Sequence, residues 1–568
     1  MLRNLPTKWD MEADLVAIGS GLAGLGAAIT AHDHGASAVV LERADQLGGV
    51  TALSLGECWI PGSDPEAALG IEDTPESGFR YLKRLAMGYN DDLATLNLTV
   101  HAREALRWFT SAIGLRMMVI RGCPDYYYGH TNDAVKEGRL LEIEPFDAKA
   151  LGEWQARVRV SPVVPYGMTH PDMMERGGSA NMAKWDFALM GERLAGDIRC
   201  LGAGLAAAFV KGAADRGIAM HTGMNAVELI GDGTRVVGVR CATGGGDMFV
   251  RGTRGVVVAV SSYERNADFN KTLGQQLDLG TMVFATIDGA NFRLTGPVGA
   301  RVAKVPDVTL LGVRVPGEEM EDGSMLTRPV MAQIGLPHTI VVNRKAQRFG
   351  NEAFYREFFM KTDHIDGASQ THANFPCWAV LDSQAREKYL FAAVPPGQDF
   401  PEGMAVKADS IAELAKAIGL DPAVLAATVA RFNMHAEQGE DPEWGRGSHL
   451  WSTYMSGDVF HKPHPNLGPL LKAPFYAIEL CRMGGSAIPS TGVVADQHCR
   501  AIDWLGQPIP GLYVAGNSVA RLETGAMMQS GVSNARGMTH GWLAALHATG
   551  HASTLLASEA KRLYARLV

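Results

Sequence analysis

Three glycines near the N-terminus have the spacing of a phosphate-binding turn, and an acidic residue follows at the position of a ribose ligand. Gly19, Gly21 and Gly24 lie between an apolar run and a stretch of small residues typical of a helix. In this pattern the first glycine permits a sharp turn, the second lets the backbone approach a pyrophosphate, and the third lets helix and strand pack closely. Glu42 ends the next apolar run, roughly 20 residues on, where a carboxylate accepts hydrogen bonds from ribose hydroxyls. The sequence therefore predicts a dinucleotide whose pyrophosphate sits on the amide groups at a helix start.

Two further glycine-rich turns extend this prediction along the chain. Gly48 and Gly49 follow Glu42 closely, which suits a backbone that lies along a flat cofactor, and Gly516 ends a short apolar run near the C-terminus. The residues predicted to contact the cofactor from the three turns are Gly19, Ser20, Gly21, Leu22, Ala23, Gly24, Glu42, Arg43, Gly48, Gly49, Val50, Thr51, Gly56, Gly516 and Asn517.

Together these segments resemble those of FAD enzymes of the fumarate reductase and 3-ketosteroid dehydrogenase superfamily, and the resemblance extends over nearly the whole chain. It implies FAD rather than a dissociable NAD, because in that superfamily the C-terminal segment returns to close the FAD site. It also implies that the strand at Val227 passes the adenine, which Val227 would bind through its backbone. We expect the FAD to be non-covalent, because the sequence has no recognisable flavin-attachment motif.

Two segments carry residues that could move a proton beside the flavin. A loop at residues 123–130 contains three consecutive tyrosines, and Tyr126 best matches the tyrosine that 3-ketosteroid dehydrogenases bring over the flavin. Residues 348–352 resemble the superfamily's Arg-Phe-x-Asn-Glu turn, whose next few residues reach the active site. There, ketosteroid dehydrogenases use a tyrosine to remove a proton, whereas fumarate reductases use an arginine to donate one. This chain offers both, as Tyr355 beside Arg356, and its sequence leaves the choice between them open.

The glycine loop around Gly531 is a third candidate segment, because it leads into a predicted helix. Amide groups at such a helix start can bind the flavin O2 or a developing enolate oxygen, so we expect Gly531 and Val532 to contact the flavin and Gly531 also the substrate. The resemblance implies a carbonyl-binding tyrosine four residues before this glycine, but Met527 occupies that position. Fumarate reductases place a histidine and an arginine for substrate carboxylates where this chain has Met528 and Val532, which argues against dicarboxylate reduction.

The residues and the resemblance together predict an FAD-dependent dehydrogenase that introduces a double bond next to the carbonyl of an apolar, cyclic ketone. The candidate catalytic residues are Tyr355, Tyr126, Gly531 and Arg356. A base would remove the proton from the carbon beside the carbonyl, and a hydride would pass from the next carbon to flavin N5. A tyrosine base starts from a pKa of about 10 and needs a cationic neighbour, for which Arg356 is the candidate. Two alternatives stay open: a flavin-dependent ene reductase with Arg356 as its acid, and a flavin-binding protein that has lost catalysis.

The composition restricts the partners and the compartment. The 568 residues carry a net charge of −9 without a basic stripe, which argues against nucleic acid and anionic membrane surfaces as partners. Seven scattered cysteines without a CxxC pair indicate a reducing compartment, and no apolar run is long enough to span a bilayer. We therefore expect a cytoplasmic protein without a metal site, which binds a small apolar ketone and an electron acceptor that the sequence does not identify.

These sites require a scaffold that brings distant segments together, and the sequence predicts an α/β fold for it. We expect a Rossmann-like FAD-binding domain of the glutathione-reductase type, formed by residues 1–275 and 472–568. Residues 276–471 are richer in threonine, proline, arginine and aromatic residues and lack a dinucleotide pattern. We interpret them as an inserted α+β catalytic or capping domain.

Overall fold

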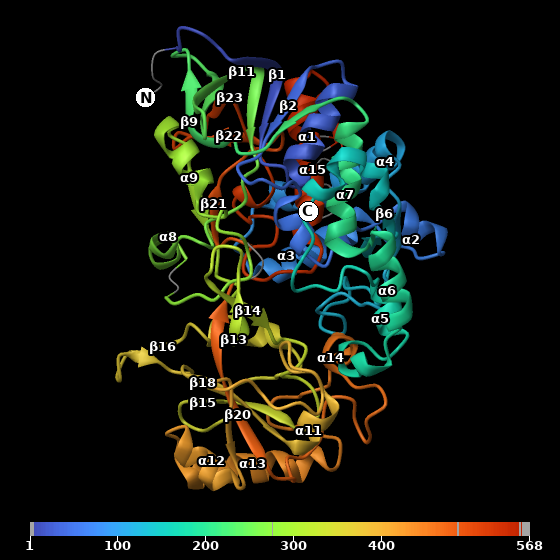
Figure 1. Ribbon diagram of the computed structural model, residues 1–568, viewed down its shortest axis with the longest axis vertical. Helices are drawn as coiled ribbons and strands as arrows, with labels where there is room; N and C mark the ends of the chain where they lie inside the picture. The colour runs from blue at the N-terminus through green and yellow to red at the C-terminus, as the bar shows by residue number, and fades with distance from the viewer. Residues whose placement is uncertain (1–4, 275–276, 485–487, 556–557, 559–568) are drawn as a thin grey trace.

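The computed structural model describes every residue except 1–4, 275–276, 485–487, 556–557 and 559–568. Figure 1 shows two bodies stacked along the long axis, with the upper one built around a parallel sheet and the lower one around an antiparallel sheet. The chain passes between the bodies more than once, so each body contains segments that are far apart in the sequence.

The sheet of the upper body has β1 (Met11–Ile18) at its centre, parallel to a strand on each side. Every residue of β1 from Leu15 to Ile18 is buried, which is expected of a strand covered on both faces. Strands β9 (Asn225–Gly231) and β10 (Val236–Thr243) extend it as an antiparallel ribbon. In pairing order its main strands are β22 (Arg500–Ile502), β23 (Pro508–Val514), β11 (Gly246–Val258), β1 (Met11–Ile18), β2 (Ala38–Leu41) and β8 (Ala219–His221).

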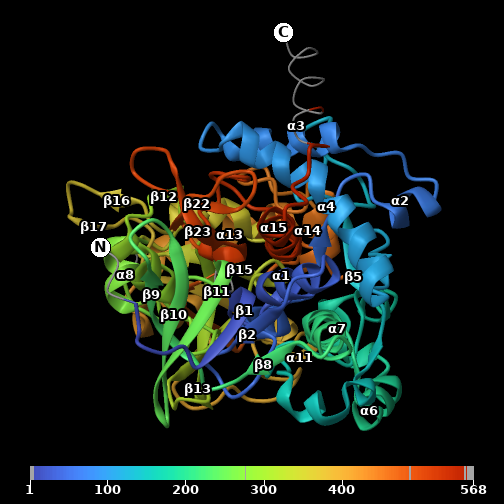
Figure 2. The ribbon, with the colours of Figure 1, turned by 90° about the horizontal axis from the view of Figure 1, so that it is seen from above.

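Two helices that begin at the predicted glycine turns lie side by side against this sheet (Figure 2). They are α1 (Leu22–Asp33) and α15 (Val532–Ala548), and α7 (Leu201–Ala214) packs beside α1. A Cβ on Gly541 would lie 2.2 Å from the carbonyl oxygen of Ala23, so a glycine is needed where α15 crosses α1. This close packing brings the N-termini of α1 and α15 to the same region of the molecule.

The lower body is an antiparallel sheet covered at its far end by α12 (Ile411–Ala417) and α13 (Pro422–Ala436) (Figure 1). Their apolar side chains join those of the sheet in one buried cluster. In pairing order its strands are β14 (Met325–Pro329), β13 (Leu310–Glu319), β20 (Phe475–Met483), β18 (Cys377–Asp382) and β15 (Thr339–Asn343), with β19 (Val406–Ala408) on β20.

The observed architecture confirms the predicted α/β fold class, with a parallel sheet beneath the glycine turns. The two sheets do not divide the chain at residues 276 and 471. Strand β20 begins at Phe475 yet belongs to the lower sheet, and β12 (Val302–Lys304) pairs with β21 (Thr491–Val493) instead of a strand of that sheet. Strand pairing thus does not mark the predicted domain boundaries, which stay a prediction. None of the described helices is both long and apolar enough to cross a membrane.

Candidate flavin and substrate site

The first glycine turn is tightly packed at two of its glycines and open at the third. Gly19 has a φ of +104°, and a Cβ there would lie 2.4 Å from the carbonyl oxygen of Ala259. A Cβ on Gly24 would lie 1.8 Å from the oxygen of Gly19. At Gly21, by contrast, the nearest atom to an added Cβ is Thr51 Oγ1, at 3.8 Å. The turn therefore leaves room beside Gly21, at the start of α1, which fits a pyrophosphate on helix amides.

Glu42 lies beyond the end of β2 with its carboxylate held against this turn. Its Oε2 accepts hydrogen bonds from the backbone N–H of Ser20 at 3.0 Å and from the Ser20 hydroxyl at 2.7 Å. Its Oε1 accepts one from the N–H of Ala44 at 2.8 Å. The side chain is only 9% exposed and lines the cavity beside the turn, so it can meet a ribose without reorganising.

One continuous cavity extends from this turn to the tyrosines of the second candidate segment. The predicted cofactor residues that line it are Gly19, Ser20, Gly21, Leu22, Ala23, Glu42, Arg43, Gly49, Val50, Thr51, Gly516, Asn517 and Gly531. The predicted ones outside its wall are Gly24, Gly48, Gly56, Val227 and Val532. Gly56 serves packing, because a Cβ there would lie 2.3 Å from the carbonyl carbon of Leu201. Ala226, next to Val227, lines the cavity in its place.

The N-terminus of α15 faces the same cavity through Gly531 and Asn534. Gly531 has a φ of +79°, and a Cβ on it would lie 2.5 Å from the backbone nitrogen of Trp59, so this loop needs glycine. Asn534 donates hydrogen bonds to Ser54 Oγ at 3.2 Å and to the Glu57 carbonyl at 2.9 Å. These contacts hold the positive end of the helix dipole toward the cavity, where it suits an oxygen that carries negative charge.

Tyr126 is fixed in the cavity wall by a glutamine that the sequence did not single out. The Gln529 Oε1 atom accepts hydrogen bonds from the N–H of Tyr126 at 3.0 Å and from the Tyr81 hydroxyl at 2.6 Å. Because a backbone N–H can only donate, these bonds also define which end of the amide is the oxygen. The tyrosine loop is thereby attached to the segment that leads into α15.

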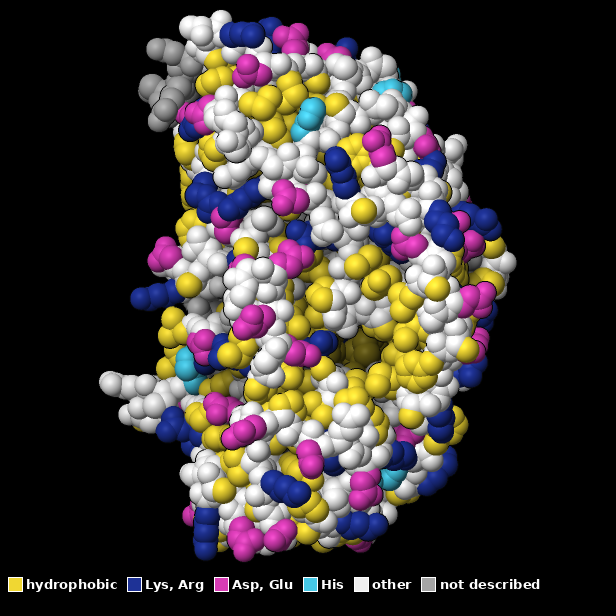
Figure 3. Space-filling view, viewed as in Figure 1, with side chains coloured by type: hydrophobic (Ala, Val, Ile, Leu, Met, Phe, Trp, Pro, Cys, Tyr) yellow, Lys and Arg dark blue, Asp and Glu magenta, His cyan; other side chains and the backbone are white. Residues whose placement is uncertain are grey.

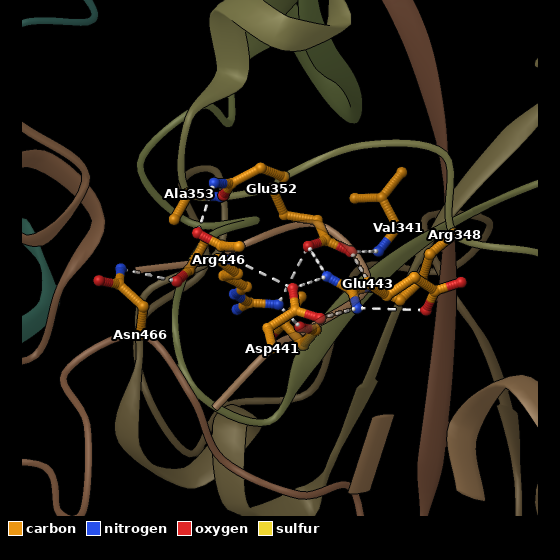
Figure 4. A network of polar contacts seen from close by, with 12 residues as sticks. Val341, Arg348, Glu352, Ala353, Asp441, Glu443, Arg446 and Asn466 are labelled. Carbon is orange, nitrogen blue, oxygen red and sulfur yellow. Dashed lines mark hydrogen bonds and ion pairs between the residues drawn. The ribbon is translucent and has the colours of Figure 1, made fainter. Parts of the chain in front are cut away.

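Tyr355 is positioned by a buried network of charges at the preceding turn (Figure 4). Arg348 binds both oxygens of Glu352, at 2.8 and 2.7 Å, and both oxygens of Asp441, at 2.9 and 2.7 Å. Glu352 also accepts a hydrogen bond from the N–H of Val341, in β15, at 3.2 Å. The ion pair between Arg348 and Glu352 therefore closes the turn that resembles Arg-Phe-x-Asn-Glu, and the bond from Val341 holds this turn against the lower sheet. The chain continues from the turn to Tyr355 in the cavity wall.

The structure separates the roles of the two neighbouring candidates. Tyr126 and Tyr355 both line the cavity, whereas Arg356 does not and is 1% exposed. Its guanidinium carbon lies 2.9 Å from the ring centroid of Tyr126, 4.0 Å from that of Tyr355 and 4.6 Å from that of Trp451. None of its guanidinium nitrogens has a hydrogen-bond partner among the described residues. The cation is thus held by aromatic faces, behind the two phenols.

Burial and the cation act on the phenols in opposite directions. Burial raises the pKa of Tyr355, and the charge of Arg356 lowers it. Burial raises the pKa of Tyr126 well above its ordinary value, again opposed by Arg356. Both phenols are therefore neutral at rest, and the arginine is the group that makes their ionised forms accessible.

An acidic residue that the sequence analysis did not single out also lines the cavity. Glu57 accepts a hydrogen bond from the hydroxyl of Ser530, which precedes Gly531, and its Oε1 lies 3.1 Å from His170 Nε2. His170 Nδ1 lies 3.0 Å from an oxygen of Glu142, which is fully buried. Although burial opposes it, the two carboxylates raise the pKa of His170 to about 10. No sequence spacing signals this cluster, because its members come together only in the fold.

Around the tyrosines the cavity wall is apolar. We call its side chains the apolar wall: Leu310, Met331, Met455, Ile488 and Met528. The charged residues among the described lining are Glu42 and Arg43, at the turn, and Glu57. Arg43 is paired with Asp288 at 2.8 Å. On the face drawn in Figure 3, a recess rimmed mainly by hydrophobic side chains lies between the upper and lower bodies.

Comparison with known proteins places this site in a family. The family model described as "FAD binding domain" matches residues 14–533. The chain is 32% identical over 548 residues to 4-oxocyclohex-2-ene-1-carboxylate 5-dehydrogenase of Sinomonas cyclohexanicum, covering 89% of this chain and 88% of that protein. It is 28% identical over 569 residues to 3-oxosteroid 1-dehydrogenase of Mycobacterium tuberculosis, covering 94% and 98%.

A solved structure agrees with these sequence matches. The 3-ketosteroid Δ1-dehydrogenase from Sterolibacterium denitrificans, in complex with 1,4-androstadiene-3,17-dione, superposes with a TM-score of 0.82 at 26% identity, covering 95% of this chain and 99% of that one. The predicted resemblance to the ketosteroid dehydrogenases and the predicted cofactor, FAD, are thereby confirmed. The chain belongs to the FAD binding domain family, and it is an FAD-dependent dehydrogenase that acts on CH–CH groups.

Proposed function

We propose that this enzyme dehydrogenates a neutral cyclic ketone at the carbon–carbon bond next to the carbonyl. The observation that carries the proposal is the pair of phenols, Tyr126 and Tyr355, in the wall of the cavity, with the cation of Arg356 behind both rings. A phenol beside a buried cation can accept a proton from a weakly acidic C–H bond, which a ketone carbonyl provides on its neighbouring carbon.

The chain's own residues supply three parts of this reaction. Tyr355 accepts the proton, and the cation of Arg356 stabilises the negative charge that develops on the phenol oxygen. The N–H groups at the start of α15, with Gly531 first, stabilise the negative charge that develops on the carbonyl oxygen. The apolar wall excludes water from the ring of the substrate. Bound FAD supplies the acceptor for the hydride that leaves the next carbon.

The charges in the cavity support a neutral substrate. Some relatives act on ring ketones that carry a carboxylate, as their names state. In this chain the described wall around the tyrosines contains one charged side chain, Glu57, and it is an acid. A substrate carboxylate would meet it without a lining cation to compensate, and like charges in a buried site repel strongly.

Arg356 as the acid of an ene reductase has less support, because its side chain is not part of the cavity wall. The two tyrosines would stand between the guanidinium and any substrate in the cavity. We therefore assign the arginine an electrostatic role.

The proposal is tested by anaerobic mixing of the FAD-loaded enzyme with a panel of three ketones. These are cyclohexanone, a neutral 3-oxosteroid and 4-oxocyclohex-2-ene-1-carboxylate. We expect a neutral ketone to bleach the flavin and to yield a product with a double bond conjugated to the carbonyl. Preferential turnover of the carboxylate would contradict the neutral-substrate proposal, and a flavin that stays oxidised with every ketone would indicate a binding protein without this activity.

A further inference from the structure

Tyr355 must pass a proton on to another group when it accepts one from the substrate, and the cavity wall contains such a group. This inference rests on the proposed function. Because burial keeps both cavity-lining phenols neutral at rest, Tyr355 can accept a proton only as it gives up its own. The dehydrogenation therefore needs an ionised acceptor in the same cavity wall as the phenols.

The two phenols and the hydroxyl of Ser530 line one stretch of the cavity wall that ends at an acidic side chain. Tyr355 and Tyr126 pack against the same guanidinium, whose carbon lies 4.0 and 2.9 Å from their ring centroids, and Tyr126, Tyr355 and Ser530 all line the cavity. Ser530 directly follows Gln529, which accepts the hydrogen bond from the N–H of Tyr126. The Ser530 hydroxyl in turn donates to Glu57 Oε2. Glu57 is 5% exposed and lines the cavity, so the path runs along the cavity wall and ends on a carboxylate.

The rest of the cluster keeps that carboxylate ionised. His170 lies between Glu57 and Glu142, with ring nitrogens 3.1 and 3.0 Å from their oxygens. Its two ring N–H groups donate one hydrogen bond to each carboxylate. The backbone N–H of His170 also donates to Glu142, at 3.1 Å. Burial opposes ionisation of Glu57, but the bond from His170 and the bond from Ser530 bring its pKa below the ordinary value.

The other titratable groups near Glu57 do not compete with it as proton acceptors. Burial raises the pKa of the Cys58 thiol to about 12, and it raises the pKa of Cys123 and of Tyr454 far above their ordinary values. These three groups are therefore already protonated at neutral pH. Arg356, the remaining charged neighbour, is a cation.

We propose that Glu57 is the terminal acceptor of the substrate proton, which reaches it through Tyr355, Tyr126 and Ser530. The C–H bond beside the carbonyl breaks, and its proton binds the Tyr355 oxygen. The phenol proton of Tyr355 passes to Tyr126, that of Tyr126 to Ser530, and that of Ser530 to Glu57 Oε2. The electron pair of the broken bond forms the new double bond as a hydride leaves the next carbon, and bound FAD would supply the two-electron acceptor for that hydride. One proton and one hydride are removed, and Glu57 ends neutral.

Glu57→Gln tests this assignment, because the amide preserves the side-chain shape and an oxygen for Ser530 but cannot take up a proton. We expect flavin reduction by a neutral ketone that the wild type oxidises to slow by at least ~100-fold. FAD affinity should stay within about threefold, since the substitution leaves the turn at Gly21 intact. The wild-type rate should fall at low pH as Glu57 becomes protonated, and this acidic limb should vanish in Glu57→Gln.

Glu142→Gln is the matched control, because it removes the other carboxylate from the same imidazole and leaves the proposed acceptor in place. We expect a smaller loss of rate and a retained acidic limb. Equal losses in the two variants with identical pH profiles would show that Glu57 only supports the structure, and would overturn the proposal.

Infrared difference spectra of the wild type provide a second test that does not require a variant to fold. Reduction of the enzyme by cyclohexanone or a neutral 3-oxosteroid should produce the C=O stretching band of one protonated carboxyl group, and Glu57→Gln should lack it. Absence of that band in the wild type, or its persistence in Glu57→Gln, would overturn the proposal. A wild type that oxidises neither ketone would instead refute the proposed function on which it rests.

Discussion

Replacing the buried arginine behind the tyrosines should separate stability from activity. In Arg356→Met an unbranched apolar side chain takes the place of a cation that has no hydrogen-bond partner among the described residues. A unit charge 4 Å away is worth about 4 kcal/mol at an effective dielectric constant of about 20. The guanidinium lies 4.0 Å from the Tyr355 ring centroid, and the phenol oxygen lies beyond the ring, so we take about half of that value, ~2 kcal/mol.

This energy corresponds to a rise of about 1.5 in the pKa of the phenol, and hence to a loss of about 30-fold in rate at neutral pH. The loss of rate should shrink as pH rises, because the phenol ionises more readily at higher pH. Stability should hold or increase, since replacing a buried charge with an apolar side chain is often neutral or stabilising. The assays are kcat/KM for a neutral ketone from pH 6 to 10 and thermal unfolding of the FAD-loaded protein.

Arg356→Lys is the control, because it retains a positive charge and should lose less activity than Arg356→Met. An Arg356→Met enzyme that is markedly destabilised yet turns over at the wild-type rate would refute the reasoning. A lysine variant as inactive as the methionine variant would show that the planar guanidinium, rather than its charge, is required.

Three further predictions concern the cofactor turn and the buried cluster. Gly21→Ala should fold and bind FAD at least about tenfold more weakly, because its Cβ enters the cavity, whereas Gly24→Ala should disrupt folding, because its Cβ would lie 1.8 Å from a backbone oxygen of the turn; circular dichroism and FAD titration distinguish them. Glu42→Ala should raise the Kd for FAD by roughly ten- to hundredfold, the value of ~1.5–3 kcal/mol for a hydrogen bond to a charged group, and an unchanged Kd would place the acid away from the ribose. His170 has a folded-state pKa of about 10, above its ordinary value, so the folded state holds an extra proton between about pH 6.5 and 10 and the free energy of unfolding should fall across that window by up to about 1.4 kcal/mol per pH unit. Urea unfolding at several pH values should show a shallower fall in Glu142→Gln, and an equal fall would contradict the paired imidazolium.

The cofactor turn could be predicted from sequence because its requirements are local. Gly19, Gly21 and Gly24 are close in the chain; Gly19 and Gly24 have no room for a Cβ, and Gly21 leaves the space beside the helix start open. Glu42 could be predicted from the same local pattern, because the short strand β2 ends beside the turn and Glu42 comes directly after it. The fold class could be predicted for the same reason, from one strand–turn–helix unit and its extensions.

The substrate end of the cavity could not be predicted as fully, because its contacts join distant segments. Tyr355 and Arg356 are adjacent in sequence, and only the path of the chain after the Arg348–Glu352 turn decides which one reaches the cavity. Gln529 and Glu57 carry no motif, and their positions depend on how α15 packs against strand β3 (Cys58–Trp59) and the tyrosine loop.

The central claim is that Tyr355 removes the proton beside the carbonyl, and the rate of flavin reduction in a single turnover tests it most directly. The FAD-loaded wild type, Tyr355→Phe and Tyr126→Phe are each mixed anaerobically with the neutral ketone that the wild type oxidises, and the loss of flavin absorbance is followed. We predict that Tyr355→Phe reduces its flavin at least ~100-fold more slowly than the wild type while its FAD content and thermal stability are unchanged, because only a hydroxyl is removed. A Tyr355→Phe enzyme that reduces its flavin at the wild-type rate, or a loss confined to Tyr126→Phe, would contradict this account.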